Sequence, residues 1–338
     1  MDGNYIKLNS MLWMRIKYRL GLIYKTILFK LGLGKSLLKN RYGERILVFH
    51  GIDSYGETKL NSRFISKLFF EEFIKYITTH YNIISLDDYY NKKFKKNTLN
   101  IAITFDDGYL NNYKYAVPIL EKHNVPACFY ITTIHKKAPY LWADFLDIIS
   151  FNTQKKDVFF EQKSYKKNNK NEFVNNGMSL KNIAKTLPYD TIKLMYEIFN
   201  DDWNALPPKQ FEDYWKLMNK KQIKEISKNP LFTIGAHGET HVSLTDIPLE
   251  EAKREILTSK QQLELICEQP ITEFAFPFGY YNHETAKYCE DIGFKKLLLV
   301  DYNTKNDAKN ETWKNRFVMN PYISLEQQLA CLLKGSYF

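Results

Sequence analysis

Apolar residues recur along this chain with two different periods, and each period predicts a different kind of element. From about residue 45, short apolar runs typical of buried strands alternate with longer segments in which apolar residues recur every three or four positions. We expect strands at 45–49, 82–85, 100–105, 127–132, 232–235, 273–276 and 295–300, and helices at 66–79, 111–123, 249–267 and 283–292. Strands that alternate with helices predict a parallel sheet or barrel.

A separate amphipathic segment precedes this pattern, over residues 12–31. Its apolar residues share one face of a helix, which Gly32 and Gly34 end: Trp13, Ile16, Leu20, Ile23, Tyr24, Ile27 and Leu31. Residues 1–41 hold nine Lys or Arg and one Asp, so they carry +8 of the net charge of +10. A basic helix with an apolar face can lie in a membrane interface, or it can pack on the rest of the protein.

Composition excludes several classes of protein. The chain after residue 41 carries only +2, so its charge does not indicate a nucleic-acid partner. The four cysteines are widely spaced, which favours reduced and buried thiols over disulfides or a zinc cluster. We expect neither a membrane-spanning helix nor a cleavable signal peptide, because basic residues interrupt the N-terminal apolar runs. We therefore predict a cytoplasmic protein. Peripheral contact of residues 12–31 with the inner face of the membrane is left open as an alternative to their packing on the protein.

Residues 151–225 interrupt the alternation of strands and helices. Their first part contains a Lys- and Asn-rich run at 166–171 without any apolar residue, and helical stretches are predicted near 189–200 and 208–228. We interpret the segment as an insertion, partly mobile and partly helical. It could shape a substrate site or be a solvated excursion.

Two short motifs that carry acids and imidazoles follow predicted strands. Asp106 and Asp107 follow one strand, and His237 and His241 follow another. Each pair alone is weak evidence, since adjacent acids often form a solvated turn and His pairs are often structural. Both pairs stand at the carboxyl ends of strands, where α/β barrels place their active sites. One carboxylate and two imidazoles can hold a divalent ion, and the remaining carboxylate can accept a proton from water.

These motifs resemble those of the polysaccharide deacetylases of carbohydrate esterase family 4, which have the NodB-homology domain. Residues 104–108, TFDDG, match the first family motif, and 237–241, HGETH, match its H-[ST]-x-x-H motif except at Gly238. Residues 276–279, FPFG, resemble its Pro-Tyr-Gly motif with Phe for Tyr. The resemblance extends from about residue 46 to 323, outside the insertion.

The resemblance implies a fold and a division of the chain. The fold would be α/β, a distorted (β/α)7-type barrel with a helical insertion. Residues 1–41 would form the basic amphipathic segment. Residues 42–338 would form the catalytic domain, with the insertion at about 151–225.

The resemblance also implies roles for residues at the matching positions. Asp107, His237 and His241 would hold one divalent metal ion, and Asp106 would be the general base. The backbone N–H of Phe278 would help to stabilise the oxyanion. Zinc is the first expectation for the ion, while cobalt, nickel and iron are also compatible with these ligands.

Two positions depart from the family's pattern. The Arg that often orients the base is replaced near the FPFG motif by Phe274 and Ala275, so Arg316 is a candidate to supply that charge from another strand. No His follows His283 to act as the family's C-terminal acid. His50 ends the first strand and resembles the acid of a branch in which this His comes first; the alternative is a structural His50 in the core.

Aromatic residues beside the motifs are candidates to line a sugar site, because aromatic faces stack on pyranose rings. We group Tyr109, Trp142, Tyr280 and Arg316 as substrate-binding candidates, while packing is the favoured alternative for Trp142. The expected function is a metal-dependent hydrolase that removes N-acetyl groups from an amino sugar in a bacterial surface glycan or a lipid-linked precursor. The alternatives are an O-deacetylase, a deformylase or amidohydrolase with another substrate, or an inactive glycan-binding homologue.

Overall fold

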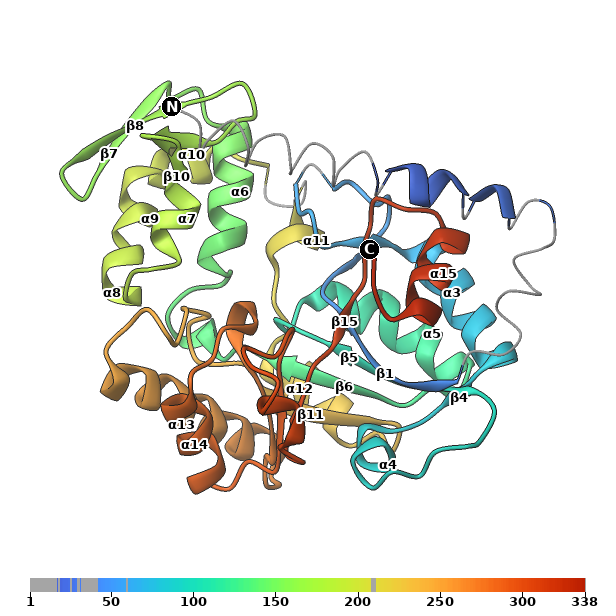
Figure 1. Cartoon of the computed structure of the whole chain (residues 1–338). Helices are drawn as coiled ribbons and strands as arrows, with labels where there is room; N and C mark the ends of the chain where they lie inside the picture. The colour runs from blue at the N-terminus through green and yellow to red at the C-terminus, as the bar shows by residue number, and fades with distance from the viewer. Residues whose placement is uncertain are drawn as a thin grey trace.

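The computed structural model describes residues 42–337 except 59 and 208–210, and in the N-terminal segment residues 17, 19–24, 26–28 and 31. A curled sheet of nine strands organises this part of the chain, and all its strand pairs are parallel. Its order is β14-β13-β12-β11-β6-β5-β1-β15, with β4 also paired to β5 (Figure 1). The strands are β1 (Gly43–Phe49), β4 (Asn82–Ile83), β5 (Leu99–Phe105), β6 (Ala127–Ile131), β11 (Phe232–Ala236), β12 (Glu273–Ala275), β13 (Lys296–Leu298), β14 (Trp313–Lys314) and β15 (Phe317–Val318).

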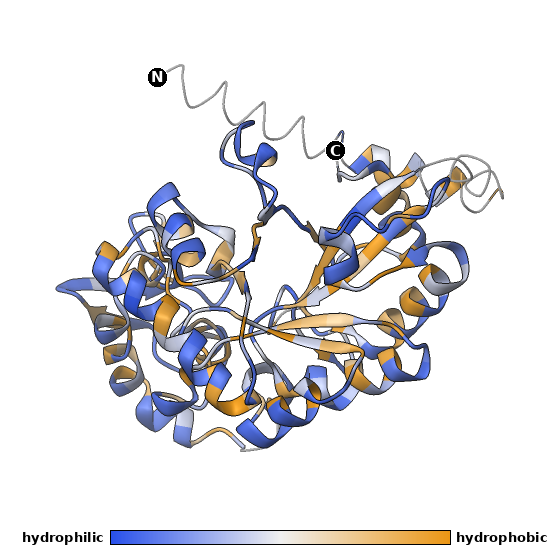
Figure 2. Ribbon diagram, turned by 90° about the horizontal axis from the view of Figure 1, so that it is seen from below, coloured by the Kyte–Doolittle hydropathy of each residue, from blue (hydrophilic) through white to orange (hydrophobic). Residues whose placement is uncertain are grey.

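Helices cover the convex side of this sheet and bury their apolar faces on it. In α3, residues Phe70, Phe73, Ile74 and Ile77 are buried at the spacing of one helical face. Figure 2 shows apolar residues on the strands and polar residues on the outer sides of the surrounding helices. The helices are α3 (Lys67–His80), α4 (Leu86–Tyr90), α5 (Val117–Lys122), α12 (Lys220–Ser227), α13 (Leu249–Cys267), α14 (His283–Asp291) and α15 (Leu325–Lys334).

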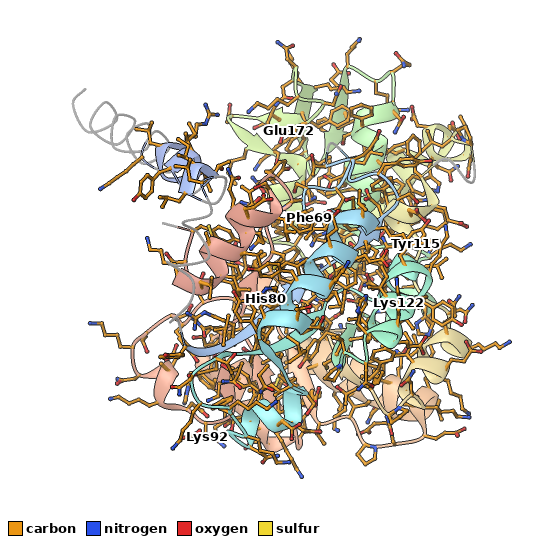
Figure 3. The ribbon with its side chains drawn as sticks, turned by 90° about the vertical axis from the view of Figure 1, so that its right-hand side faces the viewer. Phe69, His80, Lys92, Tyr115, Lys122 and Glu172 are labelled. Carbon is orange, nitrogen blue, oxygen red and sulfur yellow. The ribbon has the colours of Figure 1, made fainter. Side chains whose placement is uncertain are left out.

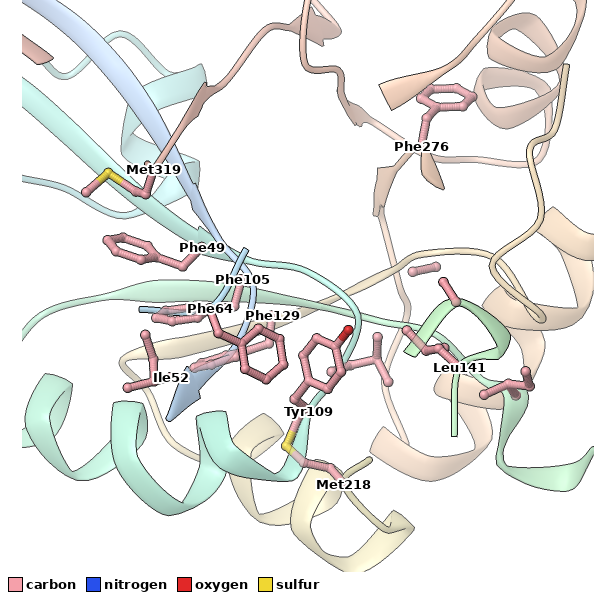
Figure 4. Packing of buried hydrophobic residues seen from close by; sticks show 14 of the residues in the cluster. Phe49, Ile52, Phe64, Phe105, Tyr109, Phe129, Leu141, Met218, Phe276 and Met319 are labelled. Atoms are coloured by element: carbon pink, nitrogen blue, oxygen red, sulfur yellow. The ribbon is translucent and has the colours of Figure 1, made fainter. Parts of the chain in front are cut away.

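Aromatic rings fill the space between the central strands and the helices. Phe49, Phe105 and Phe129 come from the adjacent strands β1, β5 and β6, and their neighbouring ring centroids lie 5.4 and 4.9 Å apart (Figure 4). Every residue of β5 is buried, which is typical of a parallel strand with both faces covered. The concave side is filled by a smaller apolar cluster that includes Tyr130.

The sheet curls into a half-barrel and does not close. β15 pairs with β1, but among the described strands β14 and β15 do not pair with each other. The prediction of an α/β barrel-like fold is confirmed in this form. The expected strands and helices are present, and α13 covers the expected residues. The helix expected at 111–123 is divided, because Pro118 lacks the N–H that would continue the ladder and a π-helical turn, η1 (Asn112–Ala116), precedes α5.

The insertion is partly helical, as expected, but its first part forms a sheet that the sequence analysis did not predict. It contains an antiparallel sheet of four short strands, followed by short helices (Figure 1). Every second residue of β7, Val158 and Phe160, is buried, and so is Tyr165 in the middle of β8. A period of two is therefore present within the polar composition. Its elements, with the preceding α6, are α6 (Trp142–Asn152), β7 (Asp157–Phe160), β8 (Lys163–Lys167), β9 (Phe173–Asn175), β10 (Met178–Ser179), α7 (Leu180–Ala184), α8 (Tyr189–Ile192), α9 (Leu194–Ile198), α10 (Asn200–Asn204) and α11 (Glu212–Trp215).

The Lys- and Asn-rich run at 166–171 forms the end of β8 and a turn. The side chain of Asn168 accepts hydrogen bonds from the backbone N–H groups of Lys170 and Glu172, at 2.8 and 2.9 Å. Such a side-chain-stabilised turn needs no apolar residue.

The N-terminal segment is helical wherever its residues from 17 to 28 are described. Residues 12–16, Gly32 and Gly34, which belong to the expected helix and its end, lie outside the described residues. No helix within the described part of the chain combines the length and the apolar character needed to cross a membrane.

Candidate active site

The turn after β5 places two carboxylates side by side. The Asp106 N–H donates to the carbonyl of Phe49 at 3.0 Å, which continues the pairing of β5 with β1. Asp107 and Gly108 then both have positive φ, 76° and 86°. A left-handed conformation is rare for a residue other than glycine, so the surrounding structure holds Asp107 in a strained turn. At Gly108 a Cβ atom would also lie 3.1 Å from the side chain of Ile131.

The two histidines lie on a loop after β11 rather than on a helix. Residues 237–243 form no helical turn, and Gly238 and His241 have φ values of 76° and 58°. The spacing of four residues therefore works through a folded loop instead of a helix face. Glu255 on α13 holds this loop, because it accepts hydrogen bonds from the N–H groups of Glu239 and Thr240, at 3.0 and 2.7 Å, and from the Thr240 hydroxyl at 2.6 Å.

Both imidazoles face Asp107 inside a buried cluster. The Asp107 Oδ1 atom lies 3.0 Å from His241 Nε2 and 3.4 Å from His237 Nε2. The three possible ligand atoms all lie within 4.8 Å of one another. His237 Nδ1 lies 2.7 Å from the carbonyl oxygen of Ala275, which leaves Nε2 free to bind an ion.

The chemistry of this cluster fits a divalent metal ion. Neither buried oxygen of Asp107 has a hydrogen-bond partner, and its contacts with the two imidazoles and Arg63 leave both oxygens open to an ion. Burial raises the pKa of Asp107, but its interactions with His241 and Arg63 outweigh burial and hold the pKa well below its usual range. An ionised carboxylate with two imidazoles is a donor set that zinc and related ions accept.

Asp106 is held by a different group, the guanidinium of Arg316. Arg316 Nη1 and Nη2 donate to the two Asp106 oxygens at 2.6 and 2.7 Å, and Nε donates to the carbonyl of Leu299 at 3.2 Å. Burial raises the pKa of Asp106, while Arg316 and His237 lower it, and the net effect is a lowered pKa. An ionised carboxylate therefore lies beside the cluster, 3.9 Å from His237 Nε2.

His50 directly follows the carboxyl end of the neighbouring strand, β1. The register of β1 and β5 pairs Phe49 with Phe105, so His50 and Asp106 are the next residues of adjacent strands. Burial and the charge of Arg63 lower the pKa of His50 to about 4, against the opposing effects of Asp107 and Asp106. The imidazole is therefore neutral near pH 7, and its pKa responds to the charges of Arg63, Asp106 and Asp107.

Comparison with known proteins identifies the family. The sequence model of the family described as polysaccharide deacetylase matches residues 93–297, which is more than half of the chain. The chain belongs to the polysaccharide deacetylase family. Among curated proteins it is 25% identical over 84 residues to YxkH of Bacillus subtilis (strain 168), which is named as a polysaccharide deacetylase. This match spans 25% of this chain and only 30% of that protein.

Several solved structures have the same fold. The deacetylase PplD of Streptococcus pyogenes, in complex with acetate, matches with a TM-score of 0.53 and 17% identity, over 84% of this chain and 97% of that chain. IcaB from Ammonifex degensii matches with a TM-score of 0.52 and 16% identity, over 86% and 97% of the two chains. BC0361, a polysaccharide deacetylase from Bacillus cereus, gives 0.52 and 18%, over 86% and 68%.

In this deacetylase-family protein, a second charged cluster adjoins the first, and no motif in the sequence indicates it. Arg63 lies between two buried acids, with Nη1 3.4 Å from Asp107 Oδ2 and Nη2 3.4 Å from Asp144 Oδ1. Asp144 also accepts hydrogen bonds from the Tyr109 hydroxyl at 2.7 Å and from Asn61 Nδ2 at 3.0 Å. Burial raises the pKa of Asp144 to about 7, despite the opposing charge of Arg63.

The FPFG segment of this family member approaches the histidines from η3 (Pro277–Gly279). Phe278 has a φ of 59°, and its ring centroid lies 4.6 Å from that of His241. No described residue accepts a hydrogen bond from the Phe278 N–H. At Gly279, whose φ is 74°, a Cβ atom would lie 2.6 Å from Val300, so only glycine fits this turn.

The four substrate-binding candidates have different positions. Tyr280 is 50% exposed beside the FPFG turn. Tyr109 and Trp142 are fully buried, so neither ring offers a face to a sugar; this contradicts the expectation for Tyr109 and agrees with the packing alternative for Trp142. They pack instead: Tyr109 against Phe64, as Figure 4 shows, and Trp142 with its indole N–H on the carbonyl of His241 at 3.0 Å. Arg316 is also buried, and its guanidinium is occupied by Asp106 rather than open to a ligand.

Proposed function

We propose that this protein is a metal-dependent deacetylase that removes N-acetyl groups from an amino sugar in a bacterial surface glycan or its precursor. The observation that carries the proposal is the pairing of two different carboxylates in one buried site. Asp107 faces two imidazoles and lacks hydrogen-bond partners, while Asp106 beside it is held ionised by Arg316. Membership of the polysaccharide deacetylase family, and a matching fold in a deacetylase that binds acetate, support this reaction.

The chain's residues supply the parts of an acyl hydrolysis. A divalent ion held by Asp107, His237 and His241, zinc being our first choice, would polarise the acyl oxygen and lower the pKa of the attacking water. Asp106 accepts the proton of that water, since its salt bridge to Arg316 keeps it ionised and fixes its two oxygens. The unpartnered N–H of Phe278 donates to the oxyanion, and this role does not require the missing Tyr hydroxyl.

His50 is our candidate for protonating the leaving amine. Its position at the next strand end supports the assignment of the chain to the branch whose acid His comes first. The ring is neutral at rest, because its pKa is lowered to about 4. The proton that it delivers is therefore the one that Asp106 has taken from water, so that base and acid act as a relay.

Release of the acyl group from a panel of glycans tests this function. The panel contains N-acetylhexosamine oligomers with O-acetylated and N-formylated analogues, and it compares the wild type with Asp106→Ala. We expect acetate from the N-acetyl substrates, and a loss of about 10²–10⁴-fold in Asp106→Ala with the metal content retained. Preference for an O-acetyl or formyl group would instead establish one of the alternative hydrolases. Absence of both bound metal and acyl release would indicate an inactive glycan-binding protein.

A further inference from the structure

An apolar stripe on the N-terminal helix faces away from the rest of the protein. Five large apolar residues spaced at three or four positions along this helix are at least half exposed. They are Leu20 (60%), Ile23 (54%), Tyr24 (63%), Ile27 (50%) and Leu31 (66%). The Leu31 N–H still donates to the carbonyl of Ile27 at 3.0 Å, so the helical spacing continues to the end of the stripe. Apolar residues in this pattern are normally buried against a partner.

The opposite side of the same helix contacts the body of the protein. Gln327 on α15 donates to the carbonyl of Leu22 at 3.3 Å and to the hydroxyl of Thr26. Leu22 is partly buried against the main core. Figures 1 and 3 both show the helix beside α15 at the edge of the molecule. At 100° per residue, Leu22 and Thr26 lie on the face opposite the stripe, so these contacts direct the stripe outward.

The positive charge beside the apolar stripe indicates what kind of partner covers it. Lys17 and Arg19 are exposed on this helix, and residues 1–41 carry nine basic residues against one acid. The rest of the chain has a net charge of only +2, so the excess is confined to this segment. An apolar face flanked by Lys and Arg complements a lipid surface with anionic headgroups, where apolar burial and charge attraction act together.

The geometry points to the N-terminal helix as a docking surface for an anionic membrane, with the stripe Leu20, Ile23, Tyr24, Ile27 and Leu31 in the interface. The contacts with Gln327 then hold α15 and the half-barrel at the membrane surface. This inference does not depend on the proposed deacetylation, because it concerns a different part of the molecule.

Sedimentation of the full-length protein with vesicles tests the docking surface. The vesicles contain phosphatidylcholine alone or mixed with phosphatidylglycerol. We expect binding to the anionic vesicles, weakened by added salt, and a loss of about tenfold or more in the double variant Ile23→Glu/Ile27→Glu. The matched control is Leu265→Glu, since Leu265 is an apolar residue on α13 that is 78% exposed. We expect this control to bind like the wild type.

Two results would overturn the inference. One is equal vesicle binding by the wild type, the stripe variant and Leu265→Glu, or no binding by any of them. The other is a wild-type dimer in solution that the stripe variant dissociates, since a second copy would then cover the stripe. Acyl release from soluble glycans is expected to be the same in all these variants, so a failure of docking is distinct from a failure of the proposed activity.

Discussion

At the scale of single residues, the two adjacent aspartates differ because different partners surround them. Asp107 meets imidazoles and has no hydrogen-bond partner, whereas Asp106 is clamped by Arg316 through two hydrogen bonds. The sequence predicted the pair and its two roles through the family motif. From the sequence, Arg316 was only a candidate partner of Asp106, because 210 positions separate the two residues and no spacing rule links them.

Arg316→Lys is expected to lower kcat/KM by about 10–100-fold, because lysine cannot form the bidentate salt bridge that holds both oxygens of Asp106. Metal content should not change, since Arg316 donates its hydrogen bonds to Leu299, Thr104 and Asp106, none of which belongs to the ligand set. Steady-state kinetics and metal analysis measure the two effects. Arg254→Lys, at an exposed ion pair on α13, is the control, and equal activity of the two variants would refute the role of Arg316.

His50 gives a prediction about stability and pH. Its pKa is about 4 in the folded protein, below the value of about 6.5 expected after unfolding. Between these values the unfolded chain binds more protons, so the free energy of unfolding falls as the pH drops from about 6.5 to about 4. In chelator-treated protein, His50→Gln should reduce this loss by on the order of 1 kcal/mol.

Urea unfolding across that pH range measures the difference for His50. The control is His283→Gln, at an exposed position that begins α14, which should keep the wild-type pH dependence. If His50→Gln and the wild type lose stability in parallel, then the pKa of His50 is not lowered in the folded protein.

At the scale of elements, α13 acts on the site through the histidine loop. Glu255 accepts three hydrogen bonds from Glu239 and Thr240, and these residues connect the two histidines. Gly238 stands where the family usually has Ser or Thr, and its φ of 76° suits glycine best. We interpret Glu255 as the residue that positions the ligand loop.

Glu255→Gln should weaken metal binding by about 10–100-fold, because the amide removes the negative charge that both N–H groups share on Oε2 and puts an NH2 group in place of Oε1, the acceptor of the Thr240 hydroxyl. Competition with a chromogenic chelator measures the affinity without reference to activity. Glu250→Gln, at an exposed position on the same helix, is the matched control. Unchanged metal affinity in Glu255→Gln would show that the loop holds its shape without this carboxylate.

The elements that the sequence predicted are those with enough residues to reveal a period. The residues of α13 show the 3.6-residue period over five turns, and its bounds agree with the prediction. β14 and β15 have two residues each, which is too few to show any alternation. The insertion's strands were missed because, apart from Phe159, the exposed positions of β7 and β8 are Asp157, Lys163, Ser164 and Lys166, and this composition resembles that of a loop.

At the scale of the whole molecule, the half-barrel gathers the site from distant parts of the chain. The carboxyl ends of β1, β5, β11 and β12 supply His50, the aspartates, the histidines and the FPFG turn. Arg316 enters just before β15, next to β1, where the sheet remains open. Motifs that follow strands could be predicted to meet at this face. The Arg63 and Asp144 contacts could not, since they depend on how a loop and α6 pack over it.

We propose that one divalent ion, bound by Asp107, His237 and His241, makes this half-barrel a deacetylase. The most direct measurement is acetate release from an N-acetylated glycan while metal-free protein is titrated with zinc. We predict that activity rises from near zero and saturates at about one equivalent per chain, with no such rise in Asp107→Asn. Full activity in the metal-free protein, or the same titration curve in Asp107→Asn, would contradict the account.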